Sequence, residues 1–176
     1  MRNRSILALL GTALAVLVSS GCTEPTAEHD HSMAESVTLS DQWVSSAETG
    51  MAAMFGTFTN AGHHDVHIVG GESPAAAMVE VHEVVADATG TMAMRPKADG
   101  LTIAPGATHE LTPGGDHLML MDLEEPLQPG ADVSLTVLFE DGSTLPVTAQ
   151  IREFAGGNEE YQPSSPGNAE APHAHG

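Results

Sequence analysis

The feature that most constrains the fold of this chain is a series of short segments in which apolar and polar residues alternate. In segments 133–139 and 144–152, an apolar residue occupies every second position. A period of two places these side chains on one face of a β-strand, where they can share a core. The segments end at Gly, Pro, Asn or Asp, and no stretch between them has a convincing helical period. The sequence therefore predicts an all-β domain.

The even spacing of the segments predicts a single β-sandwich domain of the immunoglobulin-like or cupredoxin-like type. The segment Pro74-Ala-Ala-Ala is compatible with one short turn of helix, which would not change this class. The expected strands are residues 37–44, 51–60, 65–69, 77–85, 91–97, 101–103, 109–112, 117–122, 133–139 and 144–152.

Residues 1–21 have the pattern of an export signal. Two arginines precede an apolar run, residues 6–18, that is too short for a comfortable membrane span. The following Gly-Cys22 pair suits cleavage before Cys22 and acylation of its thiol, which would anchor the mature protein at the outer face of the cytoplasmic membrane. Ser19 stands where Leu is commonest in lipoprotein signals, so a periplasmic or secreted protein without the lipid is the alternative.

The remaining chain divides into three parts. Residues 22–36 are small, acidic and His-containing, without apolar periodicity, and predict a flexible tether. Residues 37–153 contain all the expected strands and form the predicted domain. Residues 154–176 resemble the tether in composition and predict a disordered, His-containing tail.

Charge and cysteine content limit the chemistry. The chain carries 24 acidic and 5 basic residues, a formal net charge of −19, which argues against nucleic acid as a partner and attracts cations without choosing among them. Cys22 is the only cysteine, so the domain has no internal disulfide and no thiolate of its own for a metal. Any soft-metal chemistry must therefore use Met and His.

The strand expected at 117–122 separates two kinds of side chain. His117, Met119 and Met121 fall on one face. Leu118 and Leu120 fall on the other and can pack in a core. For any single residue, the simpler interpretation is that Met fills a gap in the core and His satisfies a local hydrogen bond.

Two other expected strands supply matching side chains. His82 lies on the more polar face of segment 77–85, and a hairpin would bring Met92 and Met94 of segment 91–97 close to it. Two imidazoles with two or more thioethers form a soft site suited to Cu(I), whereas Zn(II) prefers Cys, His and carboxylate. We predict a Cu(I) site, because packing alone would require four independent placements to coincide.

This arrangement resembles the PCuAC family of periplasmic copper chaperones. In that family a His is followed by a Met and then, after twenty-two intervening residues, by His-x-Met, a spacing that Met94, His117 and Met119 reproduce. The resemblance covers about residues 37–152 and includes Ser73-Pro-Ala-Ala-Ala-Met-Val-Glu-Val-His82-Glu and Pro113-Gly-Gly-Asp-His-Leu-Met-Leu-Met. It implies a cupredoxin-like sandwich with an exposed Cu(I) site. The implied ligands are His82, Met94, His117 and Met119.

Two departures from the family pattern affect this ligand set. The interval from His82 to Met94 is one residue longer than usual, which makes Met92 a rival ligand. Val84 stands where many relatives carry Met, so one auxiliary thioether is missing. Met121 is a further candidate ligand.

The resemblance implies delivery of copper toward the CuA centre of cytochrome c oxidase. The recipient would be a protein such as subunit II of the oxidase, and a Sco-type thiol protein would be a second partner. The alternative is an extracytoplasmic scavenging or storage protein for copper tolerance, which could use the same ligands. A blue-copper electron carrier needs a Cys thiolate in the domain, and no catalytic triad or carboxylate pair stands out, so we expect no enzymatic activity. The sequence does not predict the oligomeric state.

Short His-containing tracts lie outside this ligand set. Such tracts can bind Cu(II) or Zn(II) weakly, but a solvated polar loop is the more economical interpretation. One hypothesis is that the tails gather Cu(II) and raise its local concentration near the main site. These residues are His63, His64 and His67 near an expected turn, and His29, His31, His173 and His175 in the tether and the tail.

Overall fold

The computed structural model describes residues 31–154 and the backbone of residues 160–161. The predictions for the signal peptide, Cys22, His29, His173 and His175 lie outside these residues. The described elements are α1 (Met33–Ser36), β1 (Val37–Ser45), β2 (Met51–Asn60), β3 (Val66–Ser73), β4 (Ala76–Ala86), β5 (Met92–Pro96), β6 (Leu101–Ile103), β7 (Thr108–Leu111), β8 (His117–Leu123), β9 (Asp132–Phe139), β10 (Thr144–Arg152) and β11 (Glu160–Tyr161).

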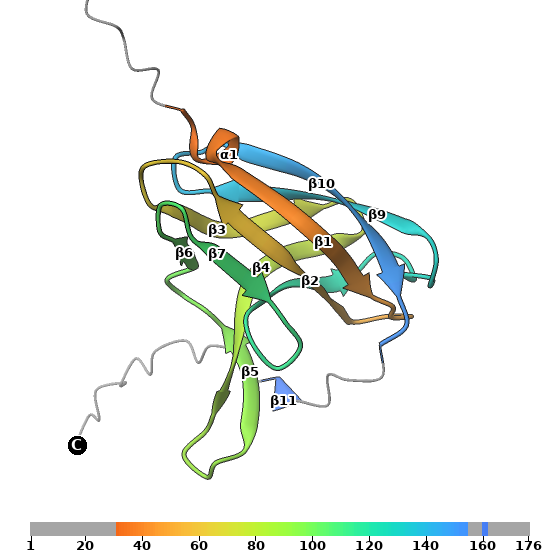
Figure 1. Ribbon diagram of the computed structural model, residues 1–176. Coiled ribbons are helices and arrows are strands. Elements are labelled where there is room, and N and C mark those ends of the chain that lie inside the picture. Colours follow the sequence, from red (N-terminus) through yellow and green to blue (C-terminus); the bar gives the residue numbers. More distant parts are fainter. Residues whose placement is uncertain (1–30, 155–159, 162–176) are drawn as a thin grey trace, which may run out of the picture.

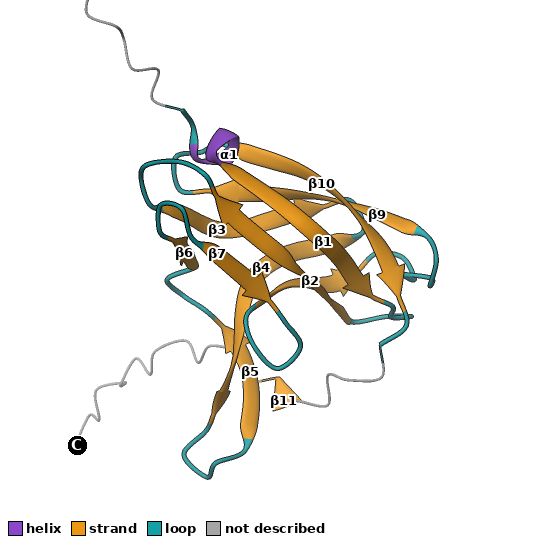
Figure 2. Ribbon diagram, in the orientation of Figure 1, coloured by secondary structure: helices purple, strands orange, loops and turns teal. Residues whose placement is uncertain are grey.

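All strands belong to one hydrogen-bonded sheet that closes on itself. The strand order is β11-β5-β4-β8-β2-β1-β10-β9-β3-β6, with β7 paired to β2. Because β4 pairs with β3 as well as with β8, the two halves of the sheet are joined along this side. Figures 1 and 2 show the strands arranged in two layers. The predicted all-β sandwich is confirmed.

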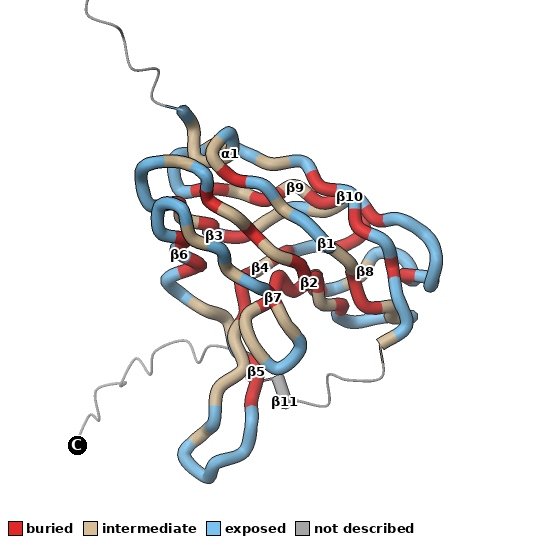
Figure 3. The backbone as a smooth tube through the Cα atoms, viewed as in Figure 1, coloured by how far each residue is buried: buried red, intermediate tan, exposed pale blue. Residues whose placement is uncertain are grey.

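The main core fills the space between the layers. Phe58, Leu120 and Val137 are fully buried at its centre, and burial of such a side chain contributes about 1.5–3 kcal/mol. The apolar residues of 133–139 and 144–152 face this core at alternate positions. Buried segments follow the strands through the sandwich in Figure 3. Among the described residues, no helix is long and apolar enough to cross a membrane.

The structure corrects the predicted ends of the domain. Helix α1 lies inside the predicted tether, 22–36, because Ser32 and Glu35 form a capping box and Asp141 accepts a hydrogen bond from the Met33 amide. In the predicted tail, 154–176, the backbone of β11 pairs in parallel with β5.

The expected helical turn at Pro74 is a tight turn between β3 and β4. Ala76 already belongs to the strand, where it pairs with Leu123 of β8. The Ala75 amide donates to the Ser73 hydroxyl, and the Ala75 carbonyl accepts from the Glu124 amide, so the short helical turn that the three alanines allowed does not form.

Strands β4 and β5 form a hairpin whose tip extends beyond the sandwich (Figure 1). Its turn is held by Asp87, whose carboxylate accepts hydrogen bonds from the Thr89 side chain and from the amides of Thr89 and Thr91. These hydrogen bonds lower the pKa of Asp87. The hairpin expected between His82 and the Met92-x-Met94 segment therefore forms, with Val84 opposite Met94.

Candidate metal site

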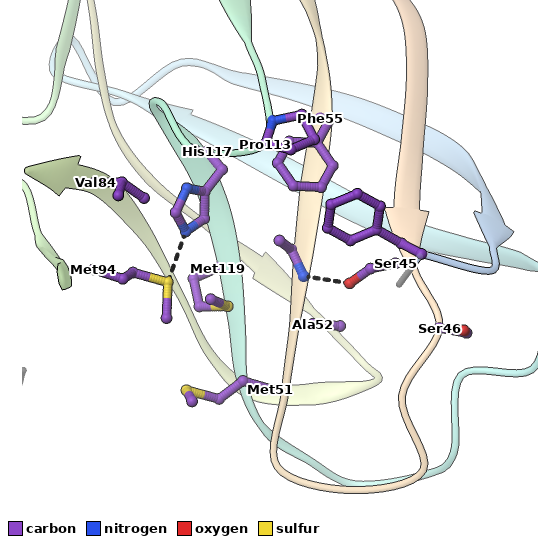
Figure 4. Close-up of a pocket in the computed structure, with 13 residues that line it drawn as sticks. Ser45, Ser46, Met51, Ala52, Phe55, Val84, Met94, Pro113, His117 and Met119 are labelled. Carbon is purple, nitrogen blue, oxygen red and sulfur yellow. Dashed lines mark hydrogen bonds between the residues drawn. The ribbon is translucent and has the colours of Figure 1, made fainter. Parts of the chain in front are cut away.

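Three neighbouring strands hold the four predicted ligands. His82 on β4 lies directly opposite His117 on β8, and their ring centroids are 5.8 Å apart. Met94 on β5 pairs with Val84, two residues beyond His82 on the same face of β4. Met119 shares a face with His117 because it follows two residues later. Figure 4 shows His117, Met94 and Met119 grouped around one pocket.

The shortest contact between predicted ligands joins His117 and Met94. The Nε2 atom of His117 lies 3.0 Å from Sδ of Met94, and Nδ1 lies 3.0 Å from the carbonyl oxygen of Gly115. A carbonyl oxygen can only accept, so Nδ1 carries the proton of the neutral ring and Nε2 carries its lone pair. The imidazole nitrogen and the thioether sulfur are therefore close enough together to contact a single metal ion.

His82 is oriented by an acidic neighbour on its own strand. Its Nε2 lies 3.0 Å from Oε2 of Glu80, and the His82 side chain is 0% exposed. Because a carboxylate accepts, Nε2 of the neutral ring donates and Nδ1 carries the lone pair. A carboxylate behind a ligating His commonly fixes the tautomer and raises its basicity.

The sulfur atoms lie in a second apolar cluster, separate from the main core. Met94, Met119 and Met121 form it with Ala53 and Val84 packed against them. Leu118 and Leu120, on the opposite face of β8, belong to the main core. The two faces of β8 are thus divided as the sequence predicts.

The exposed site implied by the family resemblance is wrong for this structure. His82, His117, Met94 and Met119 are 0%, 3%, 8% and 5% exposed. The cause is that other side chains cover this face of the sheet, and the alternation of residues along a strand does not reveal what covers a face. Access is through a pocket of about 220 Å³, whose lining includes Met94, His117 and Met119 together with Phe55 and Phe154.

An aromatic group forms one wall of this pocket. Phe154 packs against both Trp43 and Phe55, with ring centroids 5.6 and 5.8 Å apart, and Phe55 lies 6.1 Å from the ring of His117. This wall was not predicted from the sequence, because Phe154 falls in the segment expected to be a tail. The only available signal was an aromatic residue two positions after the end of β10.

The rival ligands lie farther from the two imidazoles. Met92 is 47% exposed and pairs with Ala86, toward the hairpin tip. Met121 is four residues beyond His117 on β8 and pairs with Met78 and Met51. Register therefore favours Met94 and Met119 as neighbours of the imidazoles.

A charged network holds β5 against β4 and β8 beside the site. Lys97 reaches Glu83 at 3.2 Å and Asp116 at 3.1 Å, and Arg95 reaches Glu83 at 2.9 Å. Burial lowers the pKa of Lys97, but the hydrogen bonds to Asp116 and Glu83 outweigh it, so the net pKa is raised. Asp116 also lies 2.9 Å from His109. This network was not predicted from the sequence, because its ion pairs depend on the register between neighbouring strands.

The other histidines do not gather into a comparable site. Within the part of the chain that the structure describes, no three His, Cys, Asp or Glu side chains converge in a way that could hold a metal. His67 instead contacts the Thr102 hydroxyl at 3.1 Å through Nδ1. Weak Cu(II) binding at 63–67 and in the tails stays a prediction.

A family model described as "Putative lipoprotein LpqE-like" matches residues 37–151, which is more than half of the chain. The chain belongs to the LpqE-like family. It is 38% identical over 155 residues to "Putative lipoprotein Lxx21020" of Leifsonia xyli subsp. xyli, covering 86% of this chain and 93% of that protein.

Solved structures with the same fold as this LpqE-like chain include PCuAC domains. The copper-bound PCuAC domain from PmoF2 superposes with a TM-score of 0.56 at 17% identity, covering 68% of this chain and 94% of that domain. The Cu(I) form of DR1885 from Deinococcus radiodurans gives a TM-score of 0.50 at 28% identity, over 70% of this chain and 84% of that protein. The predicted resemblance to the PCuAC family is confirmed.

Proposed function

We propose that this LpqE-like protein is an extracytoplasmic chaperone that binds one Cu(I) ion with His82, Met94, His117 and Met119. The observation that carries this proposal is the convergence of Nε2 of His117 and Sδ of Met94, 3.0 Å apart, beside a second imidazole and a second thioether. Copper is the cargo of such a protein.

The donor set favours Cu(I) over harder or borderline ions. Thioethers are neutral and soft, whereas Zn(II) sites use thiolate, imidazole and carboxylate ligands. The carboxylate of Glu80, opposite Met119, contacts Nε2 of His82, and we assign it to supporting this ring rather than to binding the ion. Thioethers also form no disulfides, which suits a compartment where thiols are oxidised.

Transfer requires that a recipient reach the ion. The pocket over Met94, His117 and Met119 gives an incoming ligand a way to replace one protein ligand at a time. The recipient that we propose is the CuA centre of cytochrome c oxidase subunit II, with a Sco-type thiol protein as a second partner. The copper-bound and Cu(I) forms of the structural relatives support copper as the cargo. No catalytic role is proposed.

The proposed location is the outer face of the cytoplasmic membrane. Residues 1–21 would be removed as a signal, Cys22 would carry the lipid, and the residues between Cys22 and α1 would act as a tether. The matched family and the Leifsonia protein are both described as "Putative lipoprotein", which supports this arrangement. Without acylation the protein would be periplasmic or secreted.

Copper scavenging or storage for tolerance is the second candidate. The observation that favours it is burial, because none of the four proposed ligands is more than 8% exposed and an enclosed site holds a metal better than it delivers one. A deletion strain distinguishes the two roles. Loss of oxidase activity that added copper restores supports delivery, whereas normal oxidase activity with increased copper sensitivity supports storage.

Anaerobic titration with Cu(I) against a competing chelator tests the site itself. We expect one tight equivalent in the parent chain and its loss in His117→Ala and in Met119→Ala. Met54→Leu is the matched control, since Met54 lies fully buried in the main core. Tight binding that survives both alanine variants would overturn the proposal.

A further inference from the structure

We propose that Met51, Met78 and Met121 form a second Cu(I) site, made of thioethers alone, beside the His/Met site. Met121 on β8 lies directly opposite Met51 on β2 and directly opposite Met78 on β4. Residues in such register share a face of the sheet, with Cβ atoms about 4.5–5.5 Å apart. Three flexible thioethers from adjacent strands can therefore converge on one ion.

We refer to Met51, Met121 and Met78 as the methionine row. Packing in the core does not explain its two outer members, Met51 and Met78. Met51 is 36% exposed and Met78 is 45% exposed, so neither fills the core. Met121, between them, is only 9% exposed. Met92 is a third exposed methionine on this face, because the register of β5 with β4 places it on the same side as Met94. The methionines thus gather on the face that carries the proposed ligands.

The chemistry of the row selects a soft monovalent ion. Thioether sulfur is a poor ligand for hard cations such as Mg²⁺ and Ca²⁺, and a good one for Cu(I). The strongly acidic chain attracts cations in general, and the sulfur atoms would choose among them. Exposure of Met51 and Met78 would make this site weaker and faster to exchange than the buried one.

The position of the row makes it a way into the buried site. Along β8, His117, Met119 and Met121 follow at steps of two residues, which is about 6.6 Å per step. Met51 also lines the pocket of the buried site, and Figure 4 shows it among the side chains around that pocket. An ion could pass from the row to the imidazoles by exchanging one ligand at a time. This use of the row rests on the proposed function, whereas Cu(I) binding by the row does not.

The test is an anaerobic Cu(I) titration of the full mature chain carrying Cys22→Ser, so that no thiolate competes. Two bicinchoninate-type chelator concentrations separate a tight equivalent from a weaker one. We expect two equivalents in the parent and one, the tight one, in Met51→Leu/Met78→Leu/Met121→Leu. Leucine keeps the side-chain volume, so folding should be preserved. Met54→Leu, in the main core, should keep both equivalents.

His117→Ala separates failure of this inference from failure of the proposed function. If the row binds copper, this variant keeps a weaker equivalent, and X-ray absorption of that sample shows sulfur ligands only. A parent that binds a single equivalent untouched by the triple substitution would overturn the row and leave the chaperone proposal standing. A triple variant that loses both equivalents would also overturn it, because the three methionines would then belong to one shared site.

Discussion

The two faces of β8 are similarly buried but differ in chemistry. Leu118 and Leu120 are 2% and 0% exposed and pack in the main core, whereas Met119 and Met121 are 5% and 9% exposed and pack with Met94 in the second cluster. Burial alone therefore does not separate core from site in this protein. The difference is that one face offers only hydrocarbon and the other offers donor atoms. Stability should depend on the first face and metal affinity on the second.

The largest expected effect is on the hydrocarbon face. Leu120→Ala should lower the free energy of unfolding of the metal-free chain by about 3–5 kcal/mol, because it leaves a cavity at a fully buried position. Chemical denaturation measures this loss. The folded fraction should bind Cu(I) as the parent does. A lower Cu(I) affinity of the folded fraction would contradict the assignment of stability to one face of β8 and metal binding to the other.

On the donor face, Met119→Leu should lower the Cu(I) affinity and leave the stability nearly unchanged. We expect the Cu(I) affinity to fall by more than about 100-fold, since a ligand matters at least as much as the groups behind it. The unfolding free energy should change by less than about 1.5 kcal/mol, because Leu and Met have similar volumes. Chelator competition and denaturation on the same sample measure both quantities. Equal stability losses in Leu120→Ala and Met119→Leu would show that Met119 is core.

A smaller effect sharpens the role of the group behind His82. Glu80→Gln should weaken Cu(I) binding by about 10-fold, because the 3.0 Å contact from Glu80 orients the imidazole of His82. The number of bound equivalents should not change. Glu110→Gln, on β7, is the control, and an equal loss there would indicate a general charge effect instead.

The smallest effect concerns the charged network beside the site. Burial raises the pKa of Glu83, but the hydrogen bonds from Arg95 and Lys97 outweigh it, so the net pKa is lowered. The stability that this carboxylate contributes is therefore present above its unfolded-state pKa and is lost as pH falls through the folded-state value. In Glu83→Gln, stability should fall less between pH 6 and pH 3 than in the parent. The difference should be about 0.5–1 kcal/mol.

Much of the fold was predictable because alternation is a local property. The strand pattern, the β4–β5 hairpin and the division of β8 all follow from side-chain parity and turn residues. The same parity indicated one face of each strand for His82, Met94, His117 and Met119, and the structure brings these faces together on three neighbouring strands. Their roles as metal ligands stay a prediction.

Other features depend on which strands pair with each other, and local sequence patterns do not reveal the pairing of strands that are far apart in the chain. Parity assigns a side chain to a face but does not reveal what covers the face, so burial of the ligands and the wall that includes Phe154 were missed. The methionine row needs the registers of β2 and β4 with β8, both long-range pairings. Helix α1 was missed because its four residues owe their order to a capping box and to contacts with Asp141 and Ser143.

Strand β1 connects the end of the domain that joins the tether to the end that contains the metal pocket. Its first residue follows α1, at the end where the tether enters, and its last residue, Ser45, lines the pocket of the metal site. The nine residues of this strand span eight steps of about 3.3 Å, so the two ends lie at most about 26 Å apart. In a lipoprotein attached through its N-terminus, the copper pocket would therefore lie at the opposite end of the domain from the residues that continue into the tether.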